Sequence, residues 1–230
     1  MSEEVDHREV ESGLSIIASR VRATIKEPVR VAFYFDPVCP WCWVTARWLM
    51  GVREHRPLAI EWRPFSLALK NEGLDQPEAW KVVQAEGHRA LRAIESARAT
   101  SDPEAVERLY IEMARRWHHD GERRFDLVAI FAAAEVEPFD PSAPDEPCWD
   151  GSIGAAMDEV QAVVGDDIGV PAIVFDGEDP VGFYGPIMSA VPSSEEGLRL
   201  FDGFITLVRL PGFFELKRSR SGRPDPGPRP

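Results

Sequence analysis

The sequence predicts an α/β fold with a large all-helical insertion, and three observations support this prediction. A strand, a helix and a second strand follow one another within residues 29–63. From about residue 75 to 165 the apolar spacing is helical, and no strand-like run interrupts it. Short apolar runs typical of strands return between residues 172 and 184, and a last helical pattern follows them.

The first strand is the β-branched and aromatic run 29–35, which ends at Asp36. The helix after Cys39 has apolar residues at helical spacing, and Pro57 prevents its continuation. Residues 58–63 alternate in polarity as a second strand should. A unit of this kind predicts two parallel strands joined by a right-handed crossover.

A pair of cysteines stands at the start of this helix, at the carboxyl end of the first strand, where open α/β sheets usually carry their chemistry. Pro40 suits the first helical position, because its missing N–H would have no partner there. Cys39 is then at the helix N-terminus, where free N–H groups and the dipole favour its thiolate form. Cys42 follows one turn later on the same face. The spacing predicts a redox dithiol in which Cys39 attacks and Cys42 resolves.

The stretch from about 75 to 165 is too long for a loop, so we expect an inserted helical subdomain. Residues 75–78 and 101–104 each read as a capping box at a helix start. After the second box, apolar residues from 106 to 117 lie on one face of a helix that residues 120–121 should end.

The chain is expected to have three parts. Residues 1–28 are polar and charged, which predicts a partly disordered N-terminal extension. Residues 29–212 should form the folded domain, including the insertion. Residues 213–230 are basic and rich in proline, which predicts a C-terminal tail.

A proline opens the third strand, at Val170-Pro171, and proline is tolerated only at a strand start or an edge. Statistics alone favour a trans bond, because only about 5–6% of X–Pro bonds are cis in folded proteins. Residues 172–175 and 181–184 should pair as a hairpin, and residues 193–196 should cap the last helix.

This order of elements, with a dithiol after the first strand, is that of a thioredoxin fold. In such a fold the expectation for Pro171 reverses, because a cis proline at the head of this strand faces the dithiol. Pro171 is therefore a candidate catalytic residue. The Val170 backbone beside it is a candidate binding site for an extended substrate.

A zinc site is the main alternative for the cysteine pair, and it would need further ligands. The candidates are His118, His119 and Cys148. The sequence has no second C-x-x-C motif and no histidine pair at the usual zinc spacing, and Pro40 suits a helix start better than a zinc knuckle. We therefore favour redox chemistry and expect no metal.

Three further residues are candidates for substrate binding, each with a structural alternative. Trp41 stands between the cysteines and could stack on a flat ligand or simply pack. His118 could donate a proton above the dithiol, or it could interact with the carbonyls at a helix end. Asp36 could tune the thiols or simply end the strand.

The composition restricts the classes of partner and the cellular compartment that we expect. The chain has 230 residues and a formal net charge of −13, so nucleic acid is an unexpected partner. The acidic N-terminus leads into no apolar segment, which predicts neither a signal peptide nor a membrane span. We expect a cytoplasmic protein, in which a close cysteine pair is catalytic or metal-binding rather than structural.

Four segments of the chain resemble the mycothiol-dependent nitroreductases of actinobacteria, within the DsbA-like branch of the thioredoxin superfamily. These segments are 35–43 (FDPVCPWCW), 164–171 (VGDDIGVP), 183–186 (FYGP) and 213–218 (FFELKR). The resemblance implies that Cys39 is the nucleophile, that Cys42 resolves, and that His118 matches a family position near the cleft.

The resemblance also implies a reductant. Mycothiol, a small-molecule thiol, would reduce the disulfide through a mixed disulfide on Cys39. Electrons would then pass to an electrophilic or nitroaromatic compound or to a protein disulfide. No dinucleotide fingerprint follows any strand, so we expect neither nicotinamide nor flavin.

Other functions remain open at this point. The chain could be a DsbA-type protein dithiol oxidase or isomerase, or a zinc-binding or redox-sensing module without turnover. The natural substrate and the choice between a monomer and a homodimer stay undecided.

Overall fold

The computed structural model describes residues 28–230. The predicted extension, residues 1–28, therefore lies outside the described residues except for its last position.

The sheet has four strands in the order β2-β1-β3-β4. β1 (Val29–Phe35) pairs in parallel with β2 (Leu58–Pro64). β3 (Ala172–Phe175) pairs antiparallel with β1 and with β4 (Val181–Tyr184). The predicted strands and the hairpin are confirmed, and β1 becomes a central, buried strand because segments far apart in the sequence flank it.

Side chains alternate across the sheet, so each face packs against different helices. One face is covered by α2 (Pro40–Arg53) and α8 (Ser194–Val208). On this face the ring centroids of Phe175 in β3 and Phe204 in α8 are 5.7 Å apart. Towards the other face, the Tyr34 hydroxyl donates to Glu159 of α7 (Asp150–Val164) at 3.4 Å.

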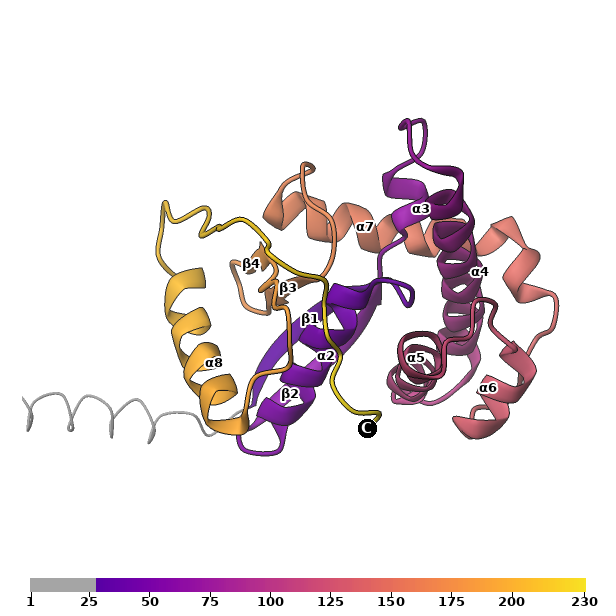
Figure 1. Cartoon of the computed structure of the whole chain (residues 1–230), viewed down its shortest axis with the longest axis horizontal. Coiled ribbons are helices and arrows are strands. Elements are labelled where there is room, and N and C mark those ends of the chain that lie inside the picture. The colour runs from indigo at the N-terminus through magenta and orange to yellow at the C-terminus, as the bar shows by residue number, and fades with distance from the viewer. Residues whose placement is uncertain (1–27) are drawn as a thin grey trace, which may run out of the picture.

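The remaining helices lie between β2 and β3 in sequence and form a block beside the sheet (Figure 1). They are α3 (Leu67–Lys70), α4 (Glu78–Thr100), α5 (Ala105–Arg115), the π-helical turn η1 (Arg116–Asp120), α6 (Leu127–Ala133), and the short turns η2 (Ala143–Asp145) and η3 (Pro147–Trp149). The helix α7 runs across the top of Figure 1 and joins this block to the sheet. Gly121, with φ 77°, ends η1 as the sequence predicts.

The two capping boxes predicted for this block are wrong. The N-cap of α4 is Pro77, which has no side-chain acceptor. The N-cap of α5 is Glu104, because Asp102 instead accepts the Glu104 N–H at 2.9 Å and pairs with Arg108 at 2.7 Å. The box predicted for α8 is confirmed.

No helix within residues 28–230 combines the length and the apolar character needed to cross a bilayer.

Candidate active site

Cys39 is the N-cap residue of α2, with φ −79° and ψ 112°, and Pro40 occupies the first helical positions. Its sulfur accepts the backbone N–H of Cys42 at 3.4 Å. The predicted helix start at the dithiol is confirmed. An N–H that points at the sulfur stabilises negative charge there, as capping stabilises a carboxylate.

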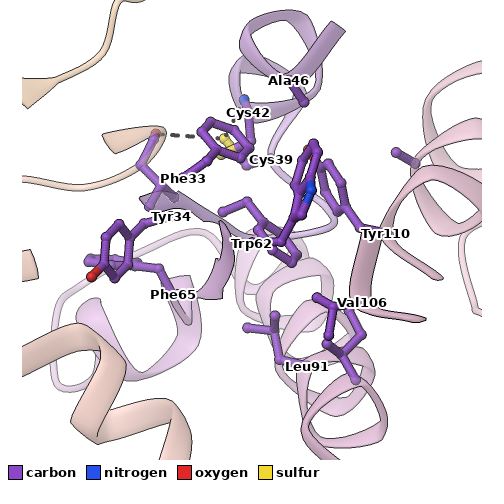
Figure 2. Close-up of a cluster of buried hydrophobic side chains, with 14 of the residues drawn as sticks. Phe33, Tyr34, Cys39, Cys42, Ala46, Trp62, Phe65, Leu91, Val106 and Tyr110 are labelled. Carbon is purple, nitrogen blue, oxygen red and sulfur yellow. Dashed lines mark hydrogen bonds between the residues drawn. The ribbon is translucent and has the colours of Figure 1, made fainter. Parts of the chain in front are cut away.

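Pro171 follows a cis peptide bond, and the residue before it faces the dithiol. The Cys39 thiol donates to the Val170 carbonyl oxygen, with the sulfur 3.7 Å from the oxygen. Both cysteines belong to the buried cluster that also contains the aromatic side chains of Trp62 and Tyr110 (Figure 2). The Cys39 side of the site is nearly closed, since that residue is 5% exposed.

Cys42 is fully buried, and both cysteines are free thiols. Burial, followed by the neighbouring Cys39, raises the pKa of the Cys42 thiol well above its ordinary value. The two sulfurs therefore have different surroundings: Cys39 receives an N–H at a helix end, and Cys42 lies in an apolar interior. This asymmetry suits an attacking thiol and a protonated resolving thiol.

Asp36 is fully buried three residues before Cys39. Burial raises the pKa of its carboxyl to about 7, against the opposing effect of two backbone donors. Those donors are the N–H groups of Leu67, at 2.9 Å, and Val38, at 3.1 Å. With no exposed surface, Asp36 is closed to direct contact with a substrate.

Helix α4 passes directly over this carboxyl at Gly87. A Cβ at this position would overlap Asp36 Oδ1 and come within 2.9 Å of Val38 Cγ2. The glycine thus lets the insertion approach the loop that carries the dithiol.

The insertion also reaches the dithiol loop through η1. His118 bonds through Nε2 to the Pro37 carbonyl oxygen at 3.0 Å. Because that oxygen can only accept, Nε2 carries the proton and Nδ1 is the free acceptor when the ring is neutral. Burial lowers the pKa of His118 to about 4, so the ring is neutral at pH 7 and suits a hydrogen-bonding role better than acid catalysis.

Trp41 is half-buried, and the guanidinium of Arg220 lies 5.0 Å from its ring centroid. This contact brings the C-terminal tail next to a ring that the sequence marks as a candidate stacking surface.

Two residues near the dithiol were missed by sequence reasoning. Trp43 is fully buried, and its indole N–H donates to His119 Nε2 at 2.8 Å. Tyr110 of α5 is buried, and its hydroxyl has no hydrogen-bond partner among residues 28–230. Burial, followed by the nearby Cys42, raises its pKa well above the ordinary value. The sequence showed Tyr110 only as one member of an apolar helix face.

Cys148 is exposed on η3, and its thiol donates to Glu146 at 3.6 Å. Within residues 28–230, no three His, Cys, Asp or Glu side chains gather closely enough to hold a metal ion.

Comparison with known proteins gives a family and a fold. The family model described as Rv2466c-like, mycothiol-dependent nitroreductase Rv2466c, matches residues 38–218. Uncharacterized protein Rv2286c of Mycobacterium tuberculosis (strain ATCC 25618 / H37Rv) is 28% identical over 195 residues, which cover 83% of this chain and 82% of that protein.

Two solved structures resemble the chain. A Nitrosomonas europaea protein, provisionally described as a protein disulfide isomerase, is 16% identical with a TM-score of 0.53, over 78% of this chain and 98% of that one. SCO1869 of Streptomyces coelicolor, provisionally described as a DsbA oxidoreductase, is 16% identical with a TM-score of 0.49. The match covers 84% of this chain and 94% of that chain. The predicted fold class, a thioredoxin fold with a DsbA-like helical insertion, is confirmed.

Proposed function

The chain belongs to the Rv2466c-like family of mycothiol-dependent nitroreductases, and from this premise we propose that its Cys39–Cys42 dithiol passes electrons from mycothiol to small electrophilic acceptors. The chain is a thiol-dependent oxidoreductase. The family's dependence on a low-molecular-weight thiol supports action in the reducing cytoplasm.

The observation that carries the proposal is the placement of Cys39. Its sulfur is the side-chain cap of α2 and accepts the Cys42 N–H at 3.4 Å, while the Val170 carbonyl oxygen lies 3.7 Å away. A sulfur at a helix N-terminus is a good nucleophile and a good leaving group, because negative charge on it is stabilised.

The reductive half of the cycle starts from the Cys39–Cys42 disulfide. A mycothiol thiolate attacks the Cys39 sulfur, which forms a mixed disulfide and releases Cys42 as a thiolate. Cys42 then takes up a proton, because burial favours its neutral form. A second mycothiol attacks the mixed disulfide, which yields mycothiol disulfide and the Cys39 thiolate.

In the oxidative half, the Cys39 thiolate and the Cys42 thiol return to the disulfide and give up two electrons and the Cys42 proton. A nitro group that accepts these and a second proton from solvent becomes a nitroso group and releases water. Asp36, whose carboxyl has a pKa of about 7 and accepts the Val38 N–H beside the dithiol, would exchange a proton during this step.

The low exposure of Cys39 favours a small acceptor over a folded protein. At 5% exposure, the sulfur is open to a small molecule or a narrow extended segment, but not to a broad protein surface. A DsbA-type dithiol oxidase or isomerase is the alternative that the experiment must separate.

The test is reduction of the oxidised protein by mycothiol, compared with glutathione, followed by turnover of a nitroaromatic compound. Cys39→Ser should abolish turnover. Cys42→Ser treated with mycothiol disulfide should accumulate a mycothiol adduct on Cys39 and release one mycothiol, seen as a mass increase of the intact protein. Cys148→Ser is the control that should leave both results unchanged. Turnover that persists in Cys39→Ser would refute the proposal, and faster reduction of a protein disulfide than of any small acceptor would favour the alternative.

A further inference from the structure

The last residues of the chain run across the face of the molecule that carries the dithiol. We call residues 220–229 the C-terminal strap. Figure 1 shows this end of the chain, in yellow, crossing α2 towards the helical insertion. The strap is held in its middle by the main chain, where the Asp225 N–H donates to the Ser189 carbonyl oxygen at 2.7 Å.

Two arginines fix the far end of the strap. Arg47 of α2 donates to the carbonyl oxygens of Pro226 and Pro228, the latter at 3.0 Å. Arg229 forms two hydrogen bonds, of 2.9 and 3.0 Å, with the carboxylate of Asp120. Because Asp120 follows the histidines of η1, the strap joins the dithiol helix to the insertion.

The near end of the strap contacts the dithiol motif itself. The Arg220 guanidinium lies 5.0 Å from the ring centroid of Trp41, the residue that precedes Cys42. It also donates to the Tyr184 hydroxyl at 3.2 Å. A guanidinium over an indole face is a favourable cation–π pair, and its remaining N–H groups stay available to an acceptor.

We propose that Arg220 is a specificity-determining residue which selects aromatic acceptors carrying an anionic group. This inference rests on the proposed function, since it concerns the second substrate of the same dithiol. The Trp41 ring offers a flat surface next to Cys42, and the Arg220 guanidinium offers planar donors that match carboxylate and nitro oxygens.

Charge supports this choice of ligand. The whole chain carries a formal net charge of −13, which would repel an anion. Arg220 and Arg47 place positive charge beside the motif, and the nearby Asp120 is already paired with Arg229. A cationic aromatic compound would instead compete with Arg220 for the Trp41 ring and be repelled by the guanidinium.

The experiment compares two chromogenic aromatic disulfides, the dianionic dithiobis(nitrobenzoate) and the neutral dithiodipyridine. The Cys39 thiolate attacks one sulfur of the reagent, forms a mixed disulfide and releases one aromatic thiolate. Cys42 then attacks the Cys39 sulfur, loses its proton, and releases the second aromatic thiolate. The reagent is reduced by two electrons, and the dithiol is oxidised to its disulfide.

The rates are measured by stopped flow on fully reduced protein in a Cys148→Ser background, so that the exposed thiol does not contribute. Arg220→Ala should lower the rate of reaction with dithiobis(nitrobenzoate) roughly threefold to tenfold, because one charge-assisted contact is lost. The rate of reaction with dithiodipyridine should not fall. Arg220→Glu should lower the rate of reaction with the dianionic reagent further. Salt at about 1 M should weaken the preference in the parent protein.

Arg223→Ala is the matched control, because it removes an equal charge from an exposed position in the strap. An equal change for both reagents in Arg220→Ala, or an equal loss of the preference in Arg223→Ala, would overturn the inference. Reaction of either reagent at Cys42 in Cys39→Ser would count against the proposed function instead. A parent protein that reacts with neither reagent would overturn both.

Discussion

The sulfur of Cys39 lies 3.7 Å from the carbonyl oxygen of Val170, a residue 131 positions away in the sequence. This contact brings the helix start of α2 and the head of β3 to one point. We therefore expect a small thiol or acceptor that reaches the sulfur to contact the Val170 backbone.

We predict that the two thiols of the reduced protein react very differently. In a Cys148→Ser background, iodoacetamide at neutral pH should label Cys39 and leave Cys42 unmodified, because Cys42 is fully buried with a raised pKa. Peptide mass spectrometry locates the label. Unfolding in urea should expose Cys42 to the same reagent, and equal labelling of both thiols before unfolding would contradict the structure.

We predict that Asp36 makes the protein less stable as pH rises. Its pKa is raised from 3.8 to about 7, so between these values the folded chain holds a proton that the unfolded chain lacks. The stabilising contribution is full below the unfolded pKa and is lost as pH rises through 7. Asp36→Asn should remove this dependence and gain up to about 4 kcal/mol over the parent at alkaline pH, less about 1 kcal/mol for a weakened backbone hydrogen bond. Urea unfolding between about pH 5 and pH 8 measures the difference.

We predict the opposite pH dependence for His118. Its pKa is lowered from 6.5 to about 4, so between these values the unfolded chain binds a proton that the folded chain does not. Its contribution is present above pH 6.5 and is lost as pH falls through 4. His118→Gln removes this titration. As pH falls from 6.5 to about 4, the free energy of unfolding of this variant should therefore fall less than that of the parent. The exposed His55→Gln is the control, and an identical acid response in both variants would show that His118 is not the cause.

We predict that Gly87→Ala destabilises the fold and Gly154→Ala does not. The new Cβ at Gly87 would meet Asp36 Oδ1 and Val38, so overpacking should cost about 1–3 kcal/mol and lower the turnover of the dithiol. Gly154 lies in α7 with nothing within 4 Å of its Cβ position, so the same substitution should gain up to about 1 kcal/mol of helix propensity. Thermal unfolding compares the two, and equal shifts in Tm would argue against the close approach of α4.

The parts of the site that follow from local chemistry could be predicted from the sequence. Pro40 fixes the helix start at Cys39, and the apolar runs fix β1, β2 and the hairpin, because each depends on residues close together in the chain. Pro171 was predicted as cis only through the fold, since local statistics alone favour trans.

The parts that depend on distant contacts could not be predicted. The bond between His118 and Pro37 depends on the π-helical turn η1, whose extra residue per turn changes which side chains face the core. The box expected at 101–104 failed because the Ser101 hydroxyl donates to the distant Glu137 carbonyl oxygen and Asp102 accepts the Glu104 N–H in its place. The Arg220–Trp41 pair spans almost the whole chain, and its basic, proline-rich segment resembles a free tail in composition.

The pairing of Arg229 with Asp120 has a practical consequence for anyone who expresses this protein. Arg229 lies against the insertion, so an affinity tag fused shortly after it would begin beside the insertion and compete with the strap. Kinetic constants measured on such a fusion would mix the properties of the enzyme with those of its tag. Removal of such a tag by a protease is therefore part of a sound assay.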